Sequence, residues 1–253
     1  MILMRCLPAI AAILALVAFA PTGQAQTPSA PLTAEQAEAV NRLVHDYLMN
    51  NPKVLQEAID HAQEAARDEA EQKVKAEMIS RREELESDPT SPVLGNSKGD
   101  VTIVEFFDYR CPYCKASAPA VAALLVADKR VRLVLKDFPI LGKESTFASR
   151  IALAVQKHGK YAEYYKAMFA LKSPIDDAAT LEIVKSIGLD PEQIRKESDA
   201  SDIDTMLAHN FDLAKAIGVE GTPAFVLGDT LIPGAVTVEV LKEQIAALRG
   251  KKS

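Results

Sequence analysis

Cysteine is scarce in this 253-residue sequence, which has only Cys6, Cys111 and Cys114. Cys6 lies within the N-terminal leader, so the body of the chain holds only the last two. A disulfide-stapled scaffold would need more cysteines, spread along the sequence. A bond between residues so close together closes too small a loop to stabilise a fold much. The pattern therefore indicates that Cys111 and Cys114 serve chemistry.

The chain also has no excess of positive charge and no sequence pattern of clustered metal ligands. Lys and Arg number 29 against 35 Asp and Glu, for a formal net charge of −6. An acidic chain without a basic run argues against nucleic acid as a partner. A zinc site would need two further Cys or His ligands at regular spacing, and the four histidines are scattered singly. We therefore predict no cofactor and no structural metal, although two reduced thiols could still hold Cu(I).

Long apolar runs are missing too. Residues 7–20 are apolar or Pro, which is shorter than the roughly 18 to 20 residues that span a bilayer. Arg5 precedes this run, and the small residues Gly23 and Ala25 follow it. That is the layout of a secretory signal peptide. We expect residues 1–25 to be a cleaved signal peptide, and no later segment is apolar enough to enter a membrane.

Residues 26–90 are predicted to be helical. Thr33 and Gln36 have the spacing of a capping box, and five apolar residues follow at helical spacing: Val40, Leu43, Val44, Tyr47 and Leu48. This apolar face is too small to fold alone, so we interpret it as a self-association surface. Asn51 and Pro52 are expected to restart a second helix that continues to about Ser87.

The second helix is rich in charged residues and Ala, so it cannot form the core of a domain of its own. Two interpretations remain open. It is a solvated arm, or it is a strut between an oligomerising segment and a catalytic domain. The second interpretation predicts a homo-oligomer formed through residues 32–87.

Residues 91–250 are predicted to form an α/β domain. Residues 91–100 are interpreted as a loop-rich boundary. Apolar runs and helical periodicity then predict strands at 101–107, 132–137, 224–227 and 230–232, and helices from 111 to about 128 and from 238 to 248. Residues 144–216 read as almost wholly helical, with breaks at Gly159, at 173–174 and at 190–191. The order predicts an α/β core with a helical insertion at about 142–218.

The sequence Cys111-Pro112-Tyr113-Cys114 follows the strand at 101–107 and opens a helix. Unpaired N–H groups and the helix dipole at a helix N-terminus favour a thiolate there. A thiolate is both nucleophile and leaving group in disulfide exchange. We expect Cys111 to be the exposed, attacking sulfur and Cys114, one turn further in, to be the buried resolving one. Pro112 fits the first turn because its missing N–H would have no helical partner.

These residues resemble the DsbA-like branch of the thioredoxin superfamily. The resemblance rests on residues 106–109 before the cysteine pair and on Gly221-Thr222-Pro223 near the C-terminus, and it covers about 93–248. It implies a thioredoxin fold, a cis peptide at Thr222-Pro223 beside the cysteines, and a Thr222 backbone that binds substrate. It also implies that Glu105 is a buried acid near the resolving cysteine. Lys136, on the next predicted strand, is a weaker candidate for its partner, the alternative being an ordinary surface lysine.

The N-terminal segment, the long helix and residues 92–96 are together similar to ScsC-type proteins, some of which are oligomeric isomerases. Tyr113 stands where the best-known DsbA has His, which puts very strong oxidising power in doubt. The resemblance implies a bacterial periplasmic protein that acts on protein cysteines and disulfides and has a membrane redox partner. Our leading hypothesis is an oligomeric disulfide isomerase. The alternatives are a monomeric dithiol oxidase and a copper-handling thiol protein.

Overall fold

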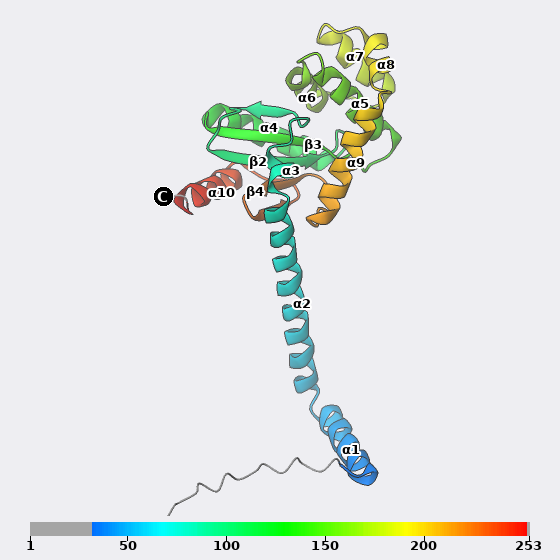
Figure 1. The fold of residues 1–253 in the computed structure, drawn as a ribbon, viewed down its shortest axis with the longest axis vertical. Helices are drawn as coiled ribbons and strands as arrows, with labels where there is room; N and C mark the ends of the chain where they lie inside the picture. Colours follow the sequence, from blue (N-terminus) through cyan, green and yellow to red (C-terminus); the bar gives the residue numbers. More distant parts are fainter. Residues whose placement is uncertain (1–31, 252–253) are drawn as a thin grey trace, which may run out of the picture. The chain divides into compact units, whose positions relative to one another are not determined.

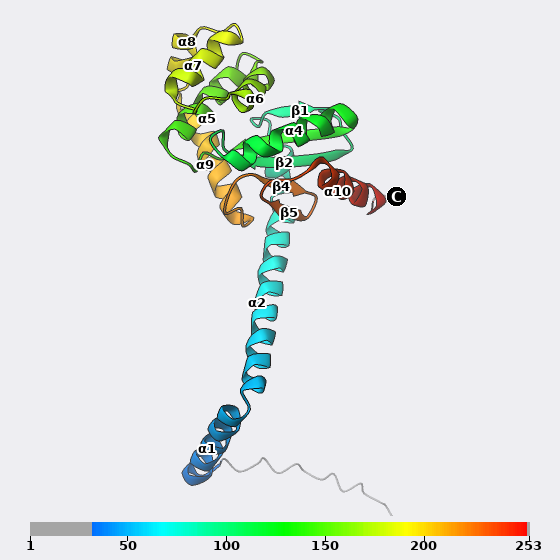
Figure 2. The same ribbon diagram turned by 180° about the vertical axis from the view of Figure 1, so that it is seen from behind.

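The computed structural model describes residues 32–251, so the expected signal peptide lies outside the described residues. The chain divides into two compact units, one up to Asp60 and one from His61 onward. Figure 1 and Figure 2 show the helices and strands along the chain from two sides. Within residues 32–251, no helix is both long and apolar enough to cross a membrane.

The second unit is built around a sheet whose described strands lie in the order β1-β3-β2-β4-β5. The strands β2 and β3 are parallel, and the other neighbouring pairs are antiparallel. The bounds are β1 (Val93–Gly95), β2 (Val101–Phe107), β3 (Val131–Asp137), β4 (Ala224–Leu227) and β5 (Thr230–Pro233). The prediction that residues 91–100 form a loop-rich boundary is wrong at β1, which is a strand. The strand has only three residues and lies among Pro, Gly and Asn, which are typical of loops, so the local sequence does not indicate it. Antiparallel pairing with β3 is what forms it.

Most helices of this unit come after β2 in sequence. They are α4 (Pro112–Ala127), α5 (Lys143–Gln156), α6 (Tyr161–Ala170), α7 (Asp177–Ser186), α8 (Pro191–Glu197), α9 (Ser201–Ala216) and α10 (Val238–Lys251). The helices α5 to α9 lie between β3 and β4 in sequence, and Figure 1 shows α5 to α8 gathered beside the sheet. This arrangement confirms the α/β core with a helical insertion that the sequence predicts.

Strand alternation divides the core into two clusters. Odd-numbered residues of β2, such as Ile103 and Phe107, belong to the larger cluster with residues of α4, α5, α6 and α10. Even-numbered residues, such as Val104 and Phe106, belong to the smaller cluster with Met78, Leu85 and residues of α9. Because successive strand residues point to opposite faces, the parity of a residue decides which helices it meets.

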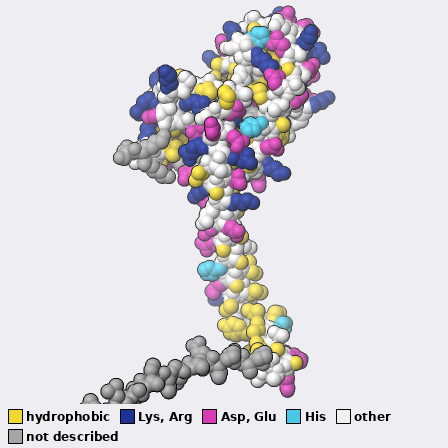
Figure 3. Space-filling view, in the orientation of Figure 1, with side chains coloured by type: hydrophobic (Ala, Val, Ile, Leu, Met, Phe, Trp, Pro, Cys, Tyr) yellow, Lys and Arg dark blue, Asp and Glu magenta, His cyan; other side chains and the backbone are white. Residues whose placement is uncertain are grey.

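The N-terminal helix α1 (Ala34–Asn50) begins at the predicted capping box. The Thr33 hydroxyl accepts a hydrogen bond from the Gln36 backbone N–H at 3.2 Å, and the Thr33 N–H donates to the Gln36 side chain at 3.0 Å. No residue of α1 is buried, and its apolar face is largely open. Figure 3 shows hydrophobic side chains gathered over α1 and the start of α2 (Pro52–Ser80).

The single helix expected from Pro52 to about Ser87 is wrong in its second part. The helix α2 ends at Ser80, and a separate short helix, α3 (Arg82–Glu86), follows a break at Arg81. Side chains of β3 bond to carbonyl oxygens at the C-terminal end of α3. Lys136 Nζ donates to the Glu84 carbonyl at 2.9 Å, and Arg132 donates to the Glu86 carbonyl. These contacts fasten α3 to the sheet, where Leu85 is buried.

Candidate active site

Cys111 is the N-cap of α4, directly after the β2 strand and a short turn. Its backbone is extended, and Pro112 occupies the first turn as the sequence indicates. The Cys111 Sγ donates to the carbonyl oxygen of Thr222 at 3.0 Å. The N–H groups of the first turn of a helix have no intrahelical partner and favour an anion. The structure therefore places the Cys111 sulfur at the N-terminus of α4 and against the Thr222 carbonyl.

The expectation that Cys111 is exposed is wrong. The residue is only 4% exposed. The reason is the loop at Thr222, whose carbonyl lies on the sulfur although it is 111 residues away in sequence. Tyr113, between the two cysteines, is by contrast well exposed. A substrate that reaches the sulfur must therefore do so beside the Thr222 loop.

Cys114 is fully buried, as predicted, and both cysteines are free thiols in the structure. Burial raises the pKa of the Cys114 thiol well above its usual value, and the nearby Cys111 and Glu105 raise it further. This thiol therefore needs a proton acceptor before it can act as a nucleophile.

The Thr222-Pro223 peptide bond is cis, as the family resemblance implies. A surface cleft of about 320 Å³ lies along this loop, lined by Thr222, Pro223 and neighbouring residues of 218–224 and 231–234. The Gly234 N–H donates to the Pro223 carbonyl at 2.8 Å and ties the loop to the end of β5. The cleft and the Cys111 sulfur thus share the Thr222 backbone.

Glu105 lies in the middle of β2 and is fully buried, in agreement with the sequence analysis. Burial raises the pKa of its carboxyl to about 7, although a hydrogen bond from Tyr165 opposes that rise. The Tyr165 hydroxyl donates to Glu105 Oε2 at 3.0 Å. Glu105 Oε1 has no hydrogen-bond partner among the described residues.

The suggestion that Lys136 pairs with Glu105 is wrong. In the register of β2 and β3, Glu105 lies opposite Leu135, while Lys136 lies opposite Phe106 and so faces the other side of the sheet. The Lys136 ammonium instead donates to Asp88 Oδ2 at 3.0 Å. The Lys136 side chain is fully buried and that of Asp88 is mostly buried, and the pair links β3 to the segment after α3. The register of β2 and β3, which only the structure gives, excludes the Glu105 pairing.

Sequence reasoning missed two supports of the site. The Asp108 carboxylate accepts from the backbone N–H of Arg110, Ile140 and Leu141 at 2.8 to 2.9 Å, which joins the turn before Cys111 to the loop after β3. Tyr165 comes from α6, in the helical insertion, 60 residues from Glu105. Only the Asp after a strand gave a local signal for a turn-capping role. Nothing in the sequence near Tyr165 points to Glu105.

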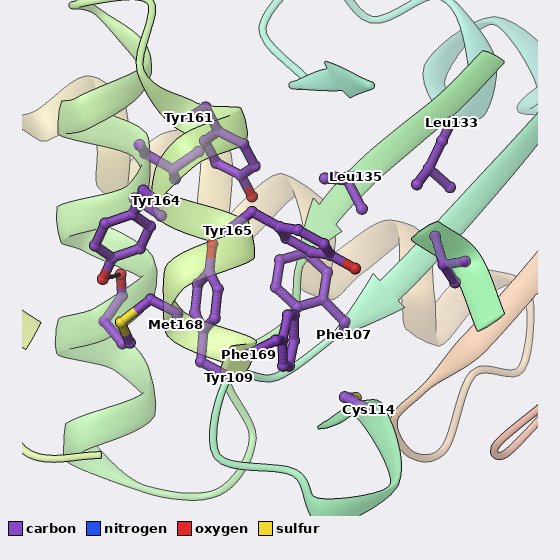
Figure 4. Packing of buried hydrophobic residues seen from close by; sticks show 14 of the residues in the cluster. Phe107, Tyr109, Cys114, Leu133, Leu135, Tyr161, Tyr164, Tyr165, Met168 and Phe169 are labelled. Atoms are coloured by element: carbon purple, nitrogen blue, oxygen red, sulfur yellow. Dashed lines mark hydrogen bonds between the residues drawn. The ribbon is translucent and has the colours of Figure 1, made fainter. Parts of the chain in front are cut away.

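Aromatic residues surround this part of the site. Figure 4 shows the side chains of α6 packed against Phe107 and Tyr109, with Cys114 close to the group. The ring of Tyr165 makes an edge contact with Phe107, with centroids 5.3 Å apart, and another with Phe169 at 4.8 Å. Such packing fixes the ring and with it the hydroxyl that reaches Glu105.

Residues 102–246, more than half of the chain, match the DsbA-like thioredoxin domain. The chain belongs to this family. Among solved structures, a thioredoxin-like oxidoreductase from Silicibacter pomeroyi is 41% identical, with a TM-score of 0.65, and the match covers 68% of this chain and 98% of that one. A Proteus mirabilis ScsC linker-deletion mutant is 30% identical, with a TM-score of 0.64, and covers 87% of this chain and 100% of its own.

The N-terminal helices of this DsbA-like protein have a match of their own. Residues 36–69 match the N-terminal domain of the copper resistance protein ScsC. The probable disulfide bond formation protein D of Bacillus cereus is 26% identical over 158 residues, which cover 56% of this chain and 72% of that protein. Two other curated relatives, Na+/H+ antiporters from Salinispora species, are much longer: the match spans about a quarter (24%) of their length.

Proposed function

We propose that this DsbA-like protein is a thiol–disulfide oxidoreductase acting on protein cysteines and disulfides, and that it works as an oligomeric disulfide isomerase. The observation that carries the proposal is the placement of the two sulfurs. Cys111 Sγ lies at the N-terminus of α4 against the Thr222 carbonyl, while Cys114 is buried one turn further on. Cys111 is thus proposed as the attacking sulfur, and Cys114 as the sulfur that resolves the mixed disulfide.

In the proposed reaction, the Cys111 thiolate attacks one sulfur of a client disulfide. A bond forms between Cys111 and the client, and the other client sulfur leaves as a thiolate. The client chain lies in the cleft along Thr222 and Pro223, where it meets backbone polar groups. Isomerisation follows when another client thiol attacks the mixed disulfide and frees Cys111 in its reduced form.

Cys114 provides the second way out of the mixed disulfide. Its thiol loses a proton to the Glu105 carboxylate, and the sulfur attacks Cys111 Sγ. The Cys111–Cys114 disulfide forms while the client leaves as a thiolate, so the client is reduced and the protein oxidised. A membrane redox partner is proposed to restore the starting state.

The proposal of an oligomer is supported by the open apolar face of α1. Val40, Leu43, Val44 and Tyr47 are each between 44% and 70% exposed. Exposed apolar patches of this kind mark association surfaces, and this segment lies within the match to the ScsC N-terminal domain. Several catalytic units in one assembly would hold a misfolded client while Cys111 attacks.

The test is reactivation of scrambled-disulfide ribonuclease in glutathione buffer. We expect the wild-type protein to restore ribonuclease activity and the Cys111→Ala variant to restore none beyond the buffer. The Cys114→Ala variant is the matched control, because it keeps the attacking sulfur. Negligible reactivation together with fast oxidation of a reduced client would instead identify a dithiol oxidase.

Location in the periplasm is also proposed, on the basis of the family and the expected signal peptide at 1–25. The full chain, expressed in a Gram-negative bacterium, should be found in the periplasmic fraction with its N-terminus near Gln26. Retention in the cytoplasm with the leader intact would contradict this part of the proposal.

Copper handling is a second candidate, favoured by the match of residues 36–69 to a domain of a copper resistance protein. The two free thiols would be the ligands, since soft thiolates select Cu(I). Titration of the reduced protein with Cu(I) should then show binding that alkylation of both cysteines removes. Equal binding before and after alkylation would exclude the thiol pair as the site.

A further inference from the structure

Tyr165 joins the helical insertion to the buried acid of the exchange site. Its side chain is 6% exposed, and its hydroxyl donates to Glu105 Oε2 at 3.0 Å. The other carboxylate oxygen, Oε1, is buried and has no hydrogen-bond partner within residues 32–251. The contact leaves one oxygen occupied and one oxygen open.

We propose that Tyr165 is a positioning residue for disulfide exchange, whose hydroxyl holds Glu105 so that the open oxygen takes the proton of Cys114 when a mixed disulfide is resolved. This inference rests on the proposed function and adds to it a residue from the helical insertion. In this step the proton moves from Cys114 to Glu105. The new bond joins Cys114 to Cys111, the bond between Cys111 and the client breaks, and the client leaves as a thiolate.

Few titratable groups face Glu105. Tyr165 of α6 and Cys114 of α4 interact with it. Its neighbours on β3 and β4, Leu135 and Phe225, carry no charge. No salt bridge to Glu105 occurs in the described part of the chain, and the nearby lysine of β3 points to the opposite face. The Tyr165 hydroxyl is therefore the polar group best placed to favour the charged carboxylate.

The hydroxyl itself stays protonated over the working range. Burial raises the pKa of Tyr165 well above its usual value, and the charges of Glu105, Cys114 and Asp137 act in the same direction. Tyr165 is thus a permanent donor. Since hydrogen bonding to the charged form lowers the pKa of a carboxyl, deleting the hydroxyl should raise that of Glu105 above about 7.

The test follows the resolution of a mixed disulfide with glutathione as the probe. Reduced full-length protein is mixed with oxidised glutathione and quenched with acid at intervals, and the Cys111–glutathione adduct is measured by mass spectrometry at several pH values. In Tyr165→Phe, we expect the pH midpoint of adduct decay to rise by about one unit, which is the effect of losing one hydrogen bond to a charged group. The adduct should accumulate near neutral pH and disappear at higher pH.

Tyr164→Phe is the matched control. It removes a buried hydroxyl from the same turn of α6, but that hydroxyl donates to the Ala148 carbonyl at 2.9 Å and not to Glu105. Both variants keep an aromatic ring in the cluster, and their unfolding midpoints are measured in parallel. The control should keep the wild-type pH midpoint even where its stability falls.

A double variant completes the design. Glu105→Gln cannot accept the proton, so adding Tyr165→Phe to it should change the decay rate no further. An unshifted midpoint in Tyr165→Phe, an equal shift in Tyr164→Phe, or a further loss in the double variant would each overturn the inference. If the wild-type protein forms no adduct at Cys111, the proposed function itself fails.

Discussion

Glu105 and Asp137 each hold a carboxyl group in the core, and burial raises the pKa of both to about 7. In the unfolded chain these groups have their ordinary values of 4.5 and 3.8. Between those values and pH 7, the folded state therefore binds more protons than the unfolded state. By linkage, the stability that these two groups contribute is greatest at the acidic end of this window and falls as pH rises through it.

We therefore predict that Glu105→Gln removes part of this loss of stability at higher pH, because the glutamine side chain does not ionise and has nearly the same size and shape as glutamate. Relative to wild type, the variant should gain about 3 kcal/mol in free energy of unfolding between pH 4.5 and pH 7.5, the equivalent of about two pKa units. Urea unfolding at the two pH values measures the difference. An identical pH dependence in wild type and variant would show that Glu105 does not titrate in this window.

The Cys114→Ala substitution separates the attack by Cys111 from the resolution of the mixed disulfide by Cys114. We expect the variant to form a mixed disulfide between Cys111 and glutathione that persists, because the buried sulfur that would release it is absent. Intact-mass measurement after acid quenching checks this. Cys111→Ala is the control and should form no adduct, since Cys114 is buried and its thiol has a raised pKa. An adduct on Cys114 would contradict the assigned roles.

Among the elements, α3 depends on β3 for its place. The Lys136 side chain is fully buried and donates to both the Glu84 carbonyl and Asp88 Oδ2. Burial opposes ionisation of Asp88, but hydrogen bonds from Thr90, Ser91 and Lys136 more than offset it and hold the pKa of Asp88 well below its usual value. The lysine charge is thus matched by an ionised partner.

Asp88→Ala should cost about 3 to 5 kcal/mol in free energy of unfolding, because it leaves a buried ammonium without its carboxylate. The control is Arg42→Ala, which breaks the exposed pair with Glu38 on α1 and should cost less than about 0.5 kcal/mol. Urea unfolding followed by circular dichroism measures both. Equal and small losses in the two variants would refute the buried-pair argument.

For the whole molecule, the open apolar face of α1 is the surface through which we propose that the chain self-associates. We predict that Leu43→Glu, at a residue 70% exposed on the apolar face, lowers the solution mass toward that of a single chain. A charge placed in an apolar interface carries a desolvation cost with no partner. Ribonuclease reactivation should fall with the mass, while adduct formation at Cys111 should not change.

Met49→Glu is the matched control for this experiment. Met49 is 69% exposed, but it projects from the opposite side of α1, about 180° around the helix axis from Val40, and so lies off the apolar face. Sedimentation should give the wild-type mass for this variant. If Leu43→Glu also keeps the wild-type mass, or if the wild type is a single chain, the proposed assembly through α1 is wrong.

The sequence by itself determined most of the helices and strands and the position of the cysteine pair. The capping box at Thr33, the apolar run at 101–107 and the cysteine pair at a strand-to-helix junction are local signals, and local periodicity and capping act within a few residues. The DsbA-like motifs gave the fold and the cis bond at Thr222-Pro223. The structure contains all of these features; the capping box, the strand and the cysteine pair depend on neighbours in the chain, whereas the fold and the cis bond came from the family resemblance.

Tertiary structure alone decided the partners. The Thr222 carbonyl covers Cys111 across 111 residues, Tyr165 reaches Glu105 across 60, and Lys136 turns to Asp88 across 48. Such contacts exist only after the chain has closed on itself, because a side chain meets whatever its face of the sheet packs against. The local sequence pattern therefore identified Cys111 and Cys114 as the reactive residues, and only tertiary packing determined which groups surround them.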